Sequence, residues 1–321
     1  MLTVLFATRN RAPLLRDVLE AYCRLELPDG GWSLVVVDNG SSDATQVVAR
    51  SFARRIPLTC LVESTPGKNR ALNTGLSAAS GDLVVFTDDD AFPRSDWLMR
   101  LRSAADAHPD YAIFGGVVLP RWETPPPAWL LADVPLGPVF TITSAELTEG
   151  PMTFHDVFGP NMAVRAELLA THRFDATIGP RGTDYAMGSE TELVWRLTQQ
   201  GFRAWHVHDA VVEHFIRRSQ MDRRWILGRA VRFGRGVYRL HGAAERSHMV
   251  RWWGVPRYLF RDLLAGAASV GVSLISLNRE RLLRARWNLG VTRGQVLEAW
   301  ARRQAEHRGQ DVAGSRSSWV H

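Results

Sequence analysis

Three consecutive aspartates, Asp88, Asp89 and Asp90, directly follow a short apolar run, Leu83–Phe86, whose composition is that of a buried strand. Like charges this close repel one another, and a divalent cation is the simplest way to relieve that repulsion. Oxygen ligands suit Mg²⁺ or Mn²⁺, which take one or two carboxylates together with waters and substrate phosphates. The alternative is an acidic turn that caps the next helix through Asp90 or Ser95. This stretch alone is compatible with both.

The bulk composition bounds the class of protein. The chain has 321 residues, of which 45% are hydrophobic and 22% charged, as in globular proteins that bury a sizeable core. Cys23 and Cys60 form neither a disulfide framework nor a zinc pattern. Because the N-terminus begins with a strand-like run and not with a secretory signal, we expect a cytoplasmic protein.

Charge is unevenly distributed along the chain. From Arg196 onward there are 23 arginines and 9 acidic residues, a balance of +14, whereas the preceding residues hold 16 basic and 24 acidic residues, a balance of −8. Lys68 is the only lysine. A basic C-terminal third favours anionic partners, namely phosphates, nucleic acid or a membrane surface.

Apolar runs alternate with amphipathic helical patterns in the first third of the chain, which predicts an α/β fold with helices on both faces of a parallel sheet. The predicted strands are Leu2–Ala7, Leu34–Val37, Leu58–Val62 and Leu83–Thr87. The polar loops that follow them, including Thr8–Arg11, Asp38–Asp43 and Asp88–Asp90, should meet at one sheet edge, where a nucleotide can bind. Neither GxGxxG nor GxxxxGK[ST] is present, which argues against dinucleotide-binding and P-loop domains.

The middle of the chain predicts further elements of the same domain. Strands are expected over Ile113–Leu119 and Phe158–Val164. A short strand pair or one extended segment is expected over Ala204–His208 and Val211–Phe215, which carry His206, His208 and His214. The segment Arg121–Gly150, rich in proline, is too long for an ordinary connection and is interpreted as a binding loop or lid. A helix is expected to begin near Gly188.

The C-terminal third is predicted to be helical. Ser219–Arg239 has a helical pattern, and Leu263–Leu277 is apolar but shorter than the ~20 residues of a spanning helix. It is interpreted as a helix packed on the sheet domain or an interfacial helix on anionic lipid, with a membrane-spanning helix as the less favoured alternative. Residues from about Gln304 onward are polar and expected to fray. The predicted domains are therefore 1–215, a basic helical region 216–303 and a tail 304–321.

Five segments, in order, resemble the family 2 glycosyltransferases, which have the GT-A fold. They are VLFATRNRAPLL, VVVDNGSSDAT, PGKNRALNTGLSAASGDLVVFTDDDA with Asp88-x-Asp90 as the DxD motif, GSETELVWRL, and VVEHF followed by an Arg/Trp helix and RFGRG. The resemblance covers about Leu2 to Arg239. It implies a mostly parallel mixed sheet flanked by helices, with the basic helical region as a C-terminal extension.

The resemblance also implies an activity. It is inverting transfer of a hexose from a UDP- or GDP-sugar to a hydroxyl of a saccharide or lipid-linked acceptor, in cell-surface polysaccharide or glycolipid assembly. A bound Mg²⁺ or Mn²⁺ would stabilise the departing diphosphate. Contact with the inner face of the cell membrane is an open alternative, and nucleic acid is not an expected partner.

Site residues are carried over from matching positions. The implied metal ligands are Asp90, Asp88 and His214. The implied donor-binding residues are Thr8, Arg11, Asp38, Lys68, Arg70, Asp88 and Asp89. Inversion needs a base opposite the leaving group, and Glu190 occupies the position where the family usually has Asp. Glu192 and Asp184 remain alternative bases, and the basic segment Arg217–Arg239 either holds phosphate or forms a solvated helix face.

Two other classes of function remain compatible with these residues. A nucleotidyltransferase also uses carboxylates and a metal on an α/β sheet, but releases pyrophosphate from a nucleoside triphosphate. A non-catalytic scaffold would bind the sugar nucleotide without turnover. The sequence leaves open the donor sugar, the nucleotide base, the acceptor and the oligomeric state.

Overall fold

The computed structural model describes residues 1–180, 185–240 and 249–316, with side chains through 305 in the last range. The chain divides into two compact units. Unit 1 comprises Met1–Pro126, most of the segment from Pro135 to residue 183, and Gly188–Arg218, whereas unit 2 comprises Pro127–Val134, a short segment ending at Met187 and the chain from Ser219 onward. Each unit is described by itself.

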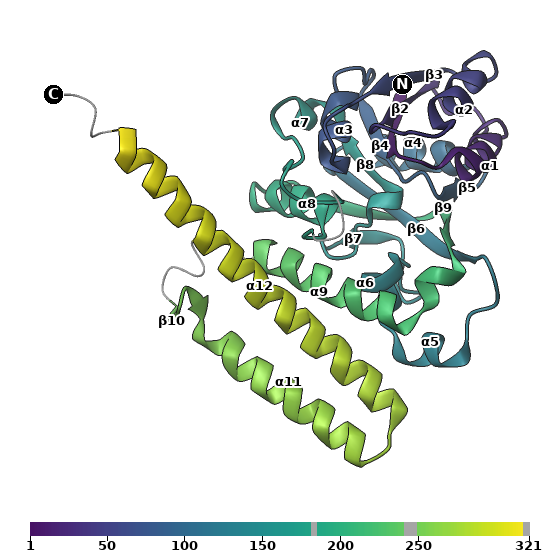
Figure 1. The fold of residues 1–321 in the computed structure, drawn as a ribbon. Helices are drawn as coiled ribbons and strands as arrows, with labels where there is room; N and C mark the ends of the chain where they lie inside the picture. The colour runs from purple at the N-terminus through teal and green to yellow at the C-terminus, as the bar shows by residue number, and fades with distance from the viewer. Residues whose placement is uncertain (181–184, 241–248, 317–321) are drawn as a thin grey trace. The chain divides into compact units, whose positions relative to one another are not determined.

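Unit 1 is built on a nine-stranded mixed sheet in the order β3-β2-β1-β4-β8-β6-β9-β5, with β7 also paired to β9 (Figure 1). The strands are β1 Leu2–Thr8, β2 Trp32–Asp38, β3 Leu58–Val62, β4 Leu83–Phe86, β5 Ala91–Pro93, β6 Ile113–Trp122, β7 Gly150–Met152, β8 Met162–Arg165 and β9 Ala204–Ile216. The first four pair in parallel, and β8 then inserts antiparallel between β4 and β6. This confirms the predicted α/β sheet and its mostly parallel first half.

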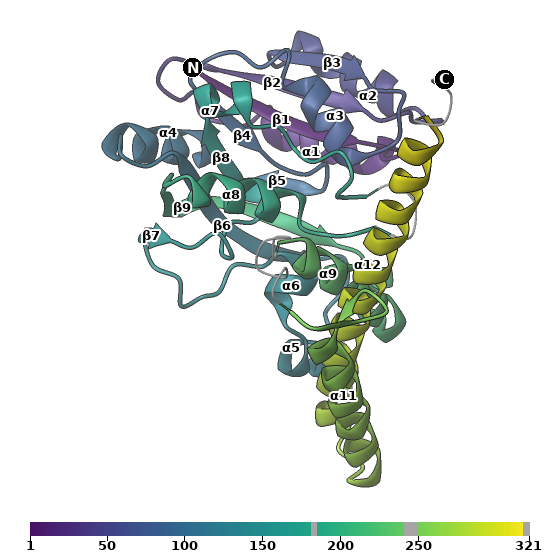
Figure 2. The same ribbon diagram turned by 90° about the vertical axis from the view of Figure 1, so that its left-hand side faces the viewer.

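Helices cover both faces of this sheet (Figure 2). They are α1 Ala12–Tyr22, α2 Thr45–Ser51, α3 Lys68–Gly75, α4 Trp97–Ala107, α6 Leu136–Phe140, α7 Ala166–Thr171 and α8 Ser189–Gln199. Strand alternation divides the core: Phe6 of β1 packs with Leu15 and Trp97 of α1 and α4, whereas its neighbour Leu5 packs with Leu72 and Leu197 of α3 and α8. The sheet is therefore buried on both sides.

Strand β9 decides between two predicted alternatives. Of a short strand pair and one extended segment over Ala204–His208 and Val211–Phe215, the structure has the second, as one continuous strand of 13 residues. Its register against β6 shifts between Gly116 and Val117, so the residues between the two apolar runs form a bulge and not a turn. A side chain at Gly116 would collide with the Ala210 carbonyl oxygen at 2.4 Å, which explains the glycine there.

Unit 2 contains the helices α5 Ala128–Asp133, α9 Arg223–Leu240, α11 Arg257–Ile275 and α12 Arg279–Arg316, and the hairpin of β10 Arg251–Trp252 with β11 Val255–Pro256. Helices α9 and α12 cross with their backbones in contact: a Cβ on Gly234 would lie 1.9 Å from the Val291 carbonyl oxygen, and one on Gly294 would lie 2.1 Å from that of Val231. Helix α12 continues through Arg316, although the sequence predicted a frayed tail from about Gln304.

Candidate active site

The three aspartates lie in the turn that joins β4 to β5, where the Ala91 amide donates to the Asp88 carbonyl oxygen at 3.2 Å. Asp89 and Asp90 are buried, with 9% and 8% of their surface exposed. Consecutive residues of a tight turn point in different directions, and each of the three carboxylates has a different nearest partner, although Arg11 lies near both Asp89 and Asp90. The turn therefore distributes its charge over several partners and is not a simple helix cap.

Asp89 faces the end of β1. It accepts a hydrogen bond of 2.7 Å from the Thr8 hydroxyl, and the Arg11 Nε lies 3.7 Å from the same carboxylate oxygen. Burial, together with the neighbouring Asp90, raises the pKa of Asp89 to about 7, although Arg11 and Thr8 act in the opposite direction. Thr8 and Arg11 thus support the acidic turn in the structure.

Asp90 faces β9. Its carboxylate lies 3.4 Å from the His214 Nε2 and 3.5 Å from the Arg217 guanidinium. The antiparallel pairing of β5 with β9 brings Asp90 close to His214, because Ala91, the next residue after Asp90, lies opposite His214. Burial favours the neutral forms, but their mutual attraction outweighs it, so the pKa of Asp90 is lowered and that of His214 is raised.

The second ring nitrogen of His214 fixes the ring. Nδ1 lies 2.7 Å from the Phe140 carbonyl oxygen and 3.3 Å from the Thr141 hydroxyl, so it can donate to the former while Nε2 faces Asp90. Phe140 ends α6, and Thr141 follows in a left-handed conformation with φ 58°. The proline-rich loop thus orients a histidine that is far away in sequence.

These residues offer a partial metal site. Asp90 and His214 present one oxygen and one nitrogen towards each other, while no group of three or more His, Cys, Asp or Glu side chains with metal-site geometry occurs in the part of the chain the structure describes. Two protein ligands fit a cation that takes its remaining ligands from water and substrate phosphates.

Lys68 joins the acidic turn to helix α8. Its ammonium lies 2.6 Å from the Asp88 Oδ1 and 2.7 Å from the Glu190 Oε1. Burial disfavours the charged ammonium, but the two carboxylates outweigh this effect and raise its pKa. Two residues 122 positions apart in sequence, Lys68 and Glu190, therefore belong to the same charge cluster.

Glu190 is held close to the backbone of the opposite loop. It lies in the first turn of α8, which follows Gly188 in the left-handed region with φ 95°. A Cβ on Gly159 would lie 2.5 Å from the Glu190 carboxyl carbon, so the glycine permits this approach. Glu192, the alternative base, is instead paired with Arg196 at 2.6 Å, and Asp184 lies outside the described residues.

Asp38 has a local role in the structure. Its carboxylate accepts hydrogen bonds from the Ser41 hydroxyl, the Ser41 amide at 3.1 Å and the Gln46 amide group at 2.8 Å. These bonds fold the loop after β2. Asp38 lies beside Thr8 in the parallel ladder, so the loop borders the acidic turn as the sequence predicted.

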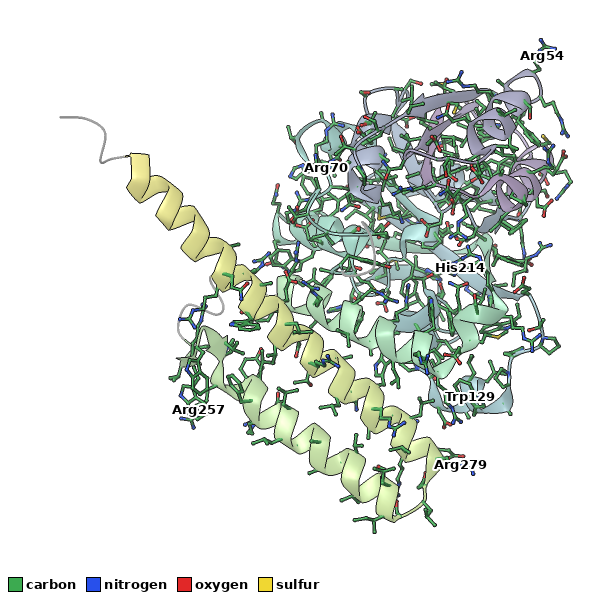
Figure 3. All side chains as sticks on the ribbon, in the orientation of Figure 1. Arg54, Arg70, Trp129, His214, Arg257 and Arg279 are labelled. Carbon is green, nitrogen blue, oxygen red and sulfur yellow. The ribbon has the colours of Figure 1, made fainter. Side chains whose placement is uncertain are left out.

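Arg70 is separate from this cluster. Its side chain is exposed on α3 (Figure 3). Among the residues that the structure describes, it forms no ion pair or hydrogen bond with the aspartates. Arg217 is not among the individually implied site residues, although it begins the basic segment Arg217–Arg239 for which the sequence allows phosphate binding. It directly follows Ile216, the last residue of β9, which pairs with Trp122 of β6, so its proximity to Asp90 depends on the strand register.

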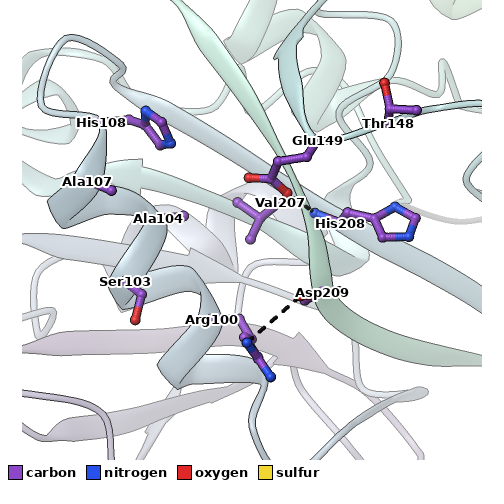
Figure 4. A pocket seen from close by; sticks show the side chains of 10 residues that line it. All are labelled: Arg100, Ser103, Ala104, Ala107, His108, Thr148, Glu149, Val207, His208 and Asp209. Atoms are coloured by element: carbon purple, nitrogen blue, oxygen red, sulfur yellow. Dashed lines mark hydrogen bonds and ion pairs between the residues drawn. The ribbon is translucent and has the colours of Figure 1, made fainter.

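A separate hollow of about 500 Å³ lies between α4 and β9 (Figure 4). Its lining includes His108, Glu149, His208 and Asp209, but none of the aspartates of the acidic turn. Glu149 accepts hydrogen bonds from Trp205 at 2.7 Å and from the His208 amide at 2.6 Å. Its acidic groups are therefore engaged in holding the local structure.

A mixed sheet of this strand order, with an acidic turn after its fourth strand, defines the chain as a GT-A glycosyltransferase. The chain belongs to glycosyl transferase family 2, since the model of that family matches residues 3–226. The predictions of fold, family and enzyme class are thereby confirmed.

The individual relatives have low sequence identity to this chain. Glycosyltransferase AglE of Haloferax volcanii is 25% identical over 214 residues. The aligned region is 66% of this chain and 66% of AglE, so the chain spans slightly less than two thirds of that relative. Succinoglycan biosynthesis protein ExoM of Rhizobium meliloti is 23% identical over 303 residues, covering 88% of this chain and 89% of ExoM. The mannosyltransferase PcManGT of Pyrobaculum calidifontis was solved in complex with GDP-Man and Mn²⁺. Its structure matches this one with a TM-score of 0.61 and 22% sequence identity, and the match covers 94% of this chain and 87% of PcManGT.

Proposed function

We propose that this glycosyltransferase transfers a hexose, with inversion, from a UDP- or GDP-sugar to a hydroxyl of a saccharide or lipid-linked acceptor. The observation that carries the proposal is the charge cluster in which Lys68 joins Asp88 of the acidic turn to Glu190 of α8. In this cluster a single ammonium group contacts both a donor-side carboxylate, Asp88, and a candidate base, Glu190. The similarity to the succinoglycan biosynthesis protein supports a saccharide acceptor.

On the donor side, Asp90 and His214 would hold the divalent cation. When bound, Mn²⁺ or Mg²⁺ neutralises the negative charge that develops on the leaving diphosphate. Arg11 and Arg217, both directed at Asp90, add cationic groups beside the same place. The structural similarity to a mannosyltransferase that binds GDP-Man and Mn²⁺ supports a nucleotide-sugar donor and a metal.

On the acceptor side, Glu190 would act as the general base. Its carboxylate takes the proton of the acceptor hydroxyl while the acceptor oxygen bonds to the anomeric carbon and the bond from that carbon to the diphosphate breaks. Attack from the face opposite the leaving group inverts the anomeric centre. Lys68 and the backbone of Gly159 restrict the position of this carboxylate, which supports a fixed geometry for proton transfer.

The test is a product assay with a panel of UDP- and GDP-sugars, saccharide acceptors and Mn²⁺ or Mg²⁺. We expect sugar transfer that chelator abolishes, a drop of at least about 100-fold in Asp90→Ala, and a product of opposite anomeric configuration by NMR. Asp110→Asn, an exposed carboxylate outside the site, is the matched control. Full activity in excess chelator would contradict the metal role, and pyrophosphate release from a nucleoside triphosphate would indicate a nucleotidyltransferase.

A further inference from the structure

Helix α11 of unit 2 is apolar around its whole circumference. Between Asp262 and Arg279 the sequence contains no ionisable side chain, and the helix is long and apolar enough to cross a membrane by composition. A helix that is hydrophobic on all sides belongs in a protein core or in lipid. The surroundings of α11 therefore decide what it does.

Very little of α11 is buried. Its buried residues are Leu259 and Ser273, and one face packs on α12, where Gly266 approaches Leu289. Only 11% of its most apolar 18-residue window is buried. The exposed large side chains follow one another on the outer surface: Leu264 at 74%, Val272 at 65%, Leu274 at 48% and Ile275 at 85%. Water would be a costly environment for this surface.

Both ends of α11 add a bulky apolar residue in a left-handed backbone conformation. Trp253, in the hairpin before the helix, has φ 50° and is 74% exposed, and Leu277, in the turn after it, has φ 51° and is 86% exposed. This conformation costs roughly 1 kcal/mol or more for such residues. The neighbouring Trp252 is also half exposed. A strained turn that presents an apolar side chain outward indicates a contact partner there.

The charges beside this apolar surface select the kind of partner. Residues 249–290 contain seven arginines and two acidic residues, Asp262 and Glu280, a balance of +5. Asp262 is paired with Arg261 at 3.1 Å. Arg257 and Arg279 lie at the two ends of α11 (Figure 3). Arginine around an apolar strip, with tryptophan at its border, matches the boundary of an anionic bilayer.

The same charges exclude a transmembrane arrangement. Residues 263–278 span only ~24 Å as a helix, less than the ~30 Å hydrocarbon core. Helix α12, which packs along α11, carries Arg284 and Arg286 at the corresponding depth, and these would have to enter the hydrocarbon. An orientation in the plane of the headgroups places the apolar strip in the acyl boundary and leaves the arginines at the phosphates.

We propose that the outer face of α11, together with Trp252, Trp253 and Leu277, binds the surface of an anionic membrane as an interfacial helix. The inference goes beyond sugar transfer and does not depend on it, because none of these residues belongs to the charge cluster of unit 1.

The test is flotation of the full chain with vesicles of phosphatidylcholine alone or with about one third phosphatidylglycerol. We expect binding to the anionic vesicles, at least about tenfold weaker binding to the neutral ones, and release by high salt without carbonate extraction. Leu264→Glu and Ile275→Glu should each reduce binding at least about tenfold. Val47→Glu, at a residue equally exposed in unit 1, is the matched control and should bind like the parent chain.

Circular dichroism and transfer of sugar in solution, measured on each variant, separate lost folding from lost membrane contact. Trp253→Ala, at an exposed turn, provides a second variant that does not introduce charge. Binding that is equal for neutral and anionic vesicles, or unchanged in the two glutamate variants, would overturn the proposal. A second outcome would also overturn the proposal. If the parent chain does not bind vesicles but forms a dimer, and Leu264→Glu dissociates that dimer, the outer face of α11 binds a second copy of the chain.

Discussion

The Lys68 ammonium lies 2.7 Å from Glu190 while it also contacts Asp88 at 2.6 Å, so one side chain connects the acidic turn with helix α8. Under the proposed mechanism, Asp88 lies on the donor side and Glu190 on the acceptor side. Substitutions of the two partners of Lys68 should therefore affect different kinetic constants, and substitution of Lys68 itself should affect both.

Glu190→Gln should lower kcat by about 10²–10⁴-fold and leave donor binding within about twofold, because the amide keeps the shape but cannot accept the proton. Donor affinity is measured by titration with a nucleotide sugar and Mn²⁺, and kcat by product formation. Glu192→Gln is the matched control on the same helix turn, and it should retain near-parental turnover because Glu192 pairs with Arg196. The reverse pattern would move the base to Glu192.

Lys68→Met should reduce both donor affinity and kcat, since it leaves Asp88 and Glu190 facing each other without the cation between them. We also expect a stability loss of about 1–3 kcal/mol in urea unfolding. The double variant Lys68→Met/Glu190→Gln should recover part of that loss, because the repulsion is removed. Strict additivity of the two stability changes would show that the two groups do not interact.

Much of this site could be predicted from the sequence because the carboxyl ends of parallel strands meet at one edge. That rule brings Thr8, Asp38 and the acidic turn together without any knowledge of side-chain contacts. The helix period then separates two basic residues that were both predicted to bind the donor. Lys68 and Arg70 are two positions apart, about 200° around α3, so one faces the carboxylates and the other faces solvent.

The rest of the site depends on long-range register. The contact of His214 with Phe140 joins two segments 74 residues apart, and the loop that carries Phe140 has no periodicity that indicates its path. The approach of Arg217 to Asp90 depends on the pairing of β5 with β9, in which Ala91 lies opposite His214, and the alternation of apolar residues cannot reveal that register. The length of α12 also departs from the prediction, because the polar composition from Gln304 onward indicates fraying although many of those residues favour helix.

Glu298 should be a strong determinant of the stability of unit 2. It is 1% exposed, and its carboxylate contacts Arg235 at 2.9 Å and Arg239 at 2.6 Å across the α9–α12 crossing. Glu298→Gln leaves the two guanidinium groups without that buried charge and should cost about 3–5 kcal/mol. Urea unfolding followed by far-UV circular dichroism measures the loss. Glu280→Gln, at an exposed position on α12, is the control, and a loss below about 0.5 kcal/mol for Glu298→Gln would contradict the assignment.

His206 should make the fold sensitive to acid. The ring is fully buried in β9, and its Nδ1 lies 3.1 Å from the Gly115 carbonyl oxygen, to which it can donate as a neutral imidazole. Burial lowers the pKa of His206 below its ordinary value, and the bond to Gly115 and the charge of Glu149 only partly oppose this. The unfolded chain, with a histidine pKa of about 6.5, therefore binds the proton first as the pH falls.

It follows that the stability contributed by neutral His206 is fully present above about pH 6.5 and decreases as the pH falls below that value. Between pH 7.5 and 5.5 the free energy of unfolding of the parent chain should decrease by up to about 1.4 kcal/mol more than that of His206→Gln, which cannot titrate but can still donate to Gly115. Urea unfolding at the two pH values measures the difference. His155→Gln, at an exposed histidine, should follow the parent chain. If His206→Gln also follows the parent chain, the buried imidazole is not the source of the acid sensitivity.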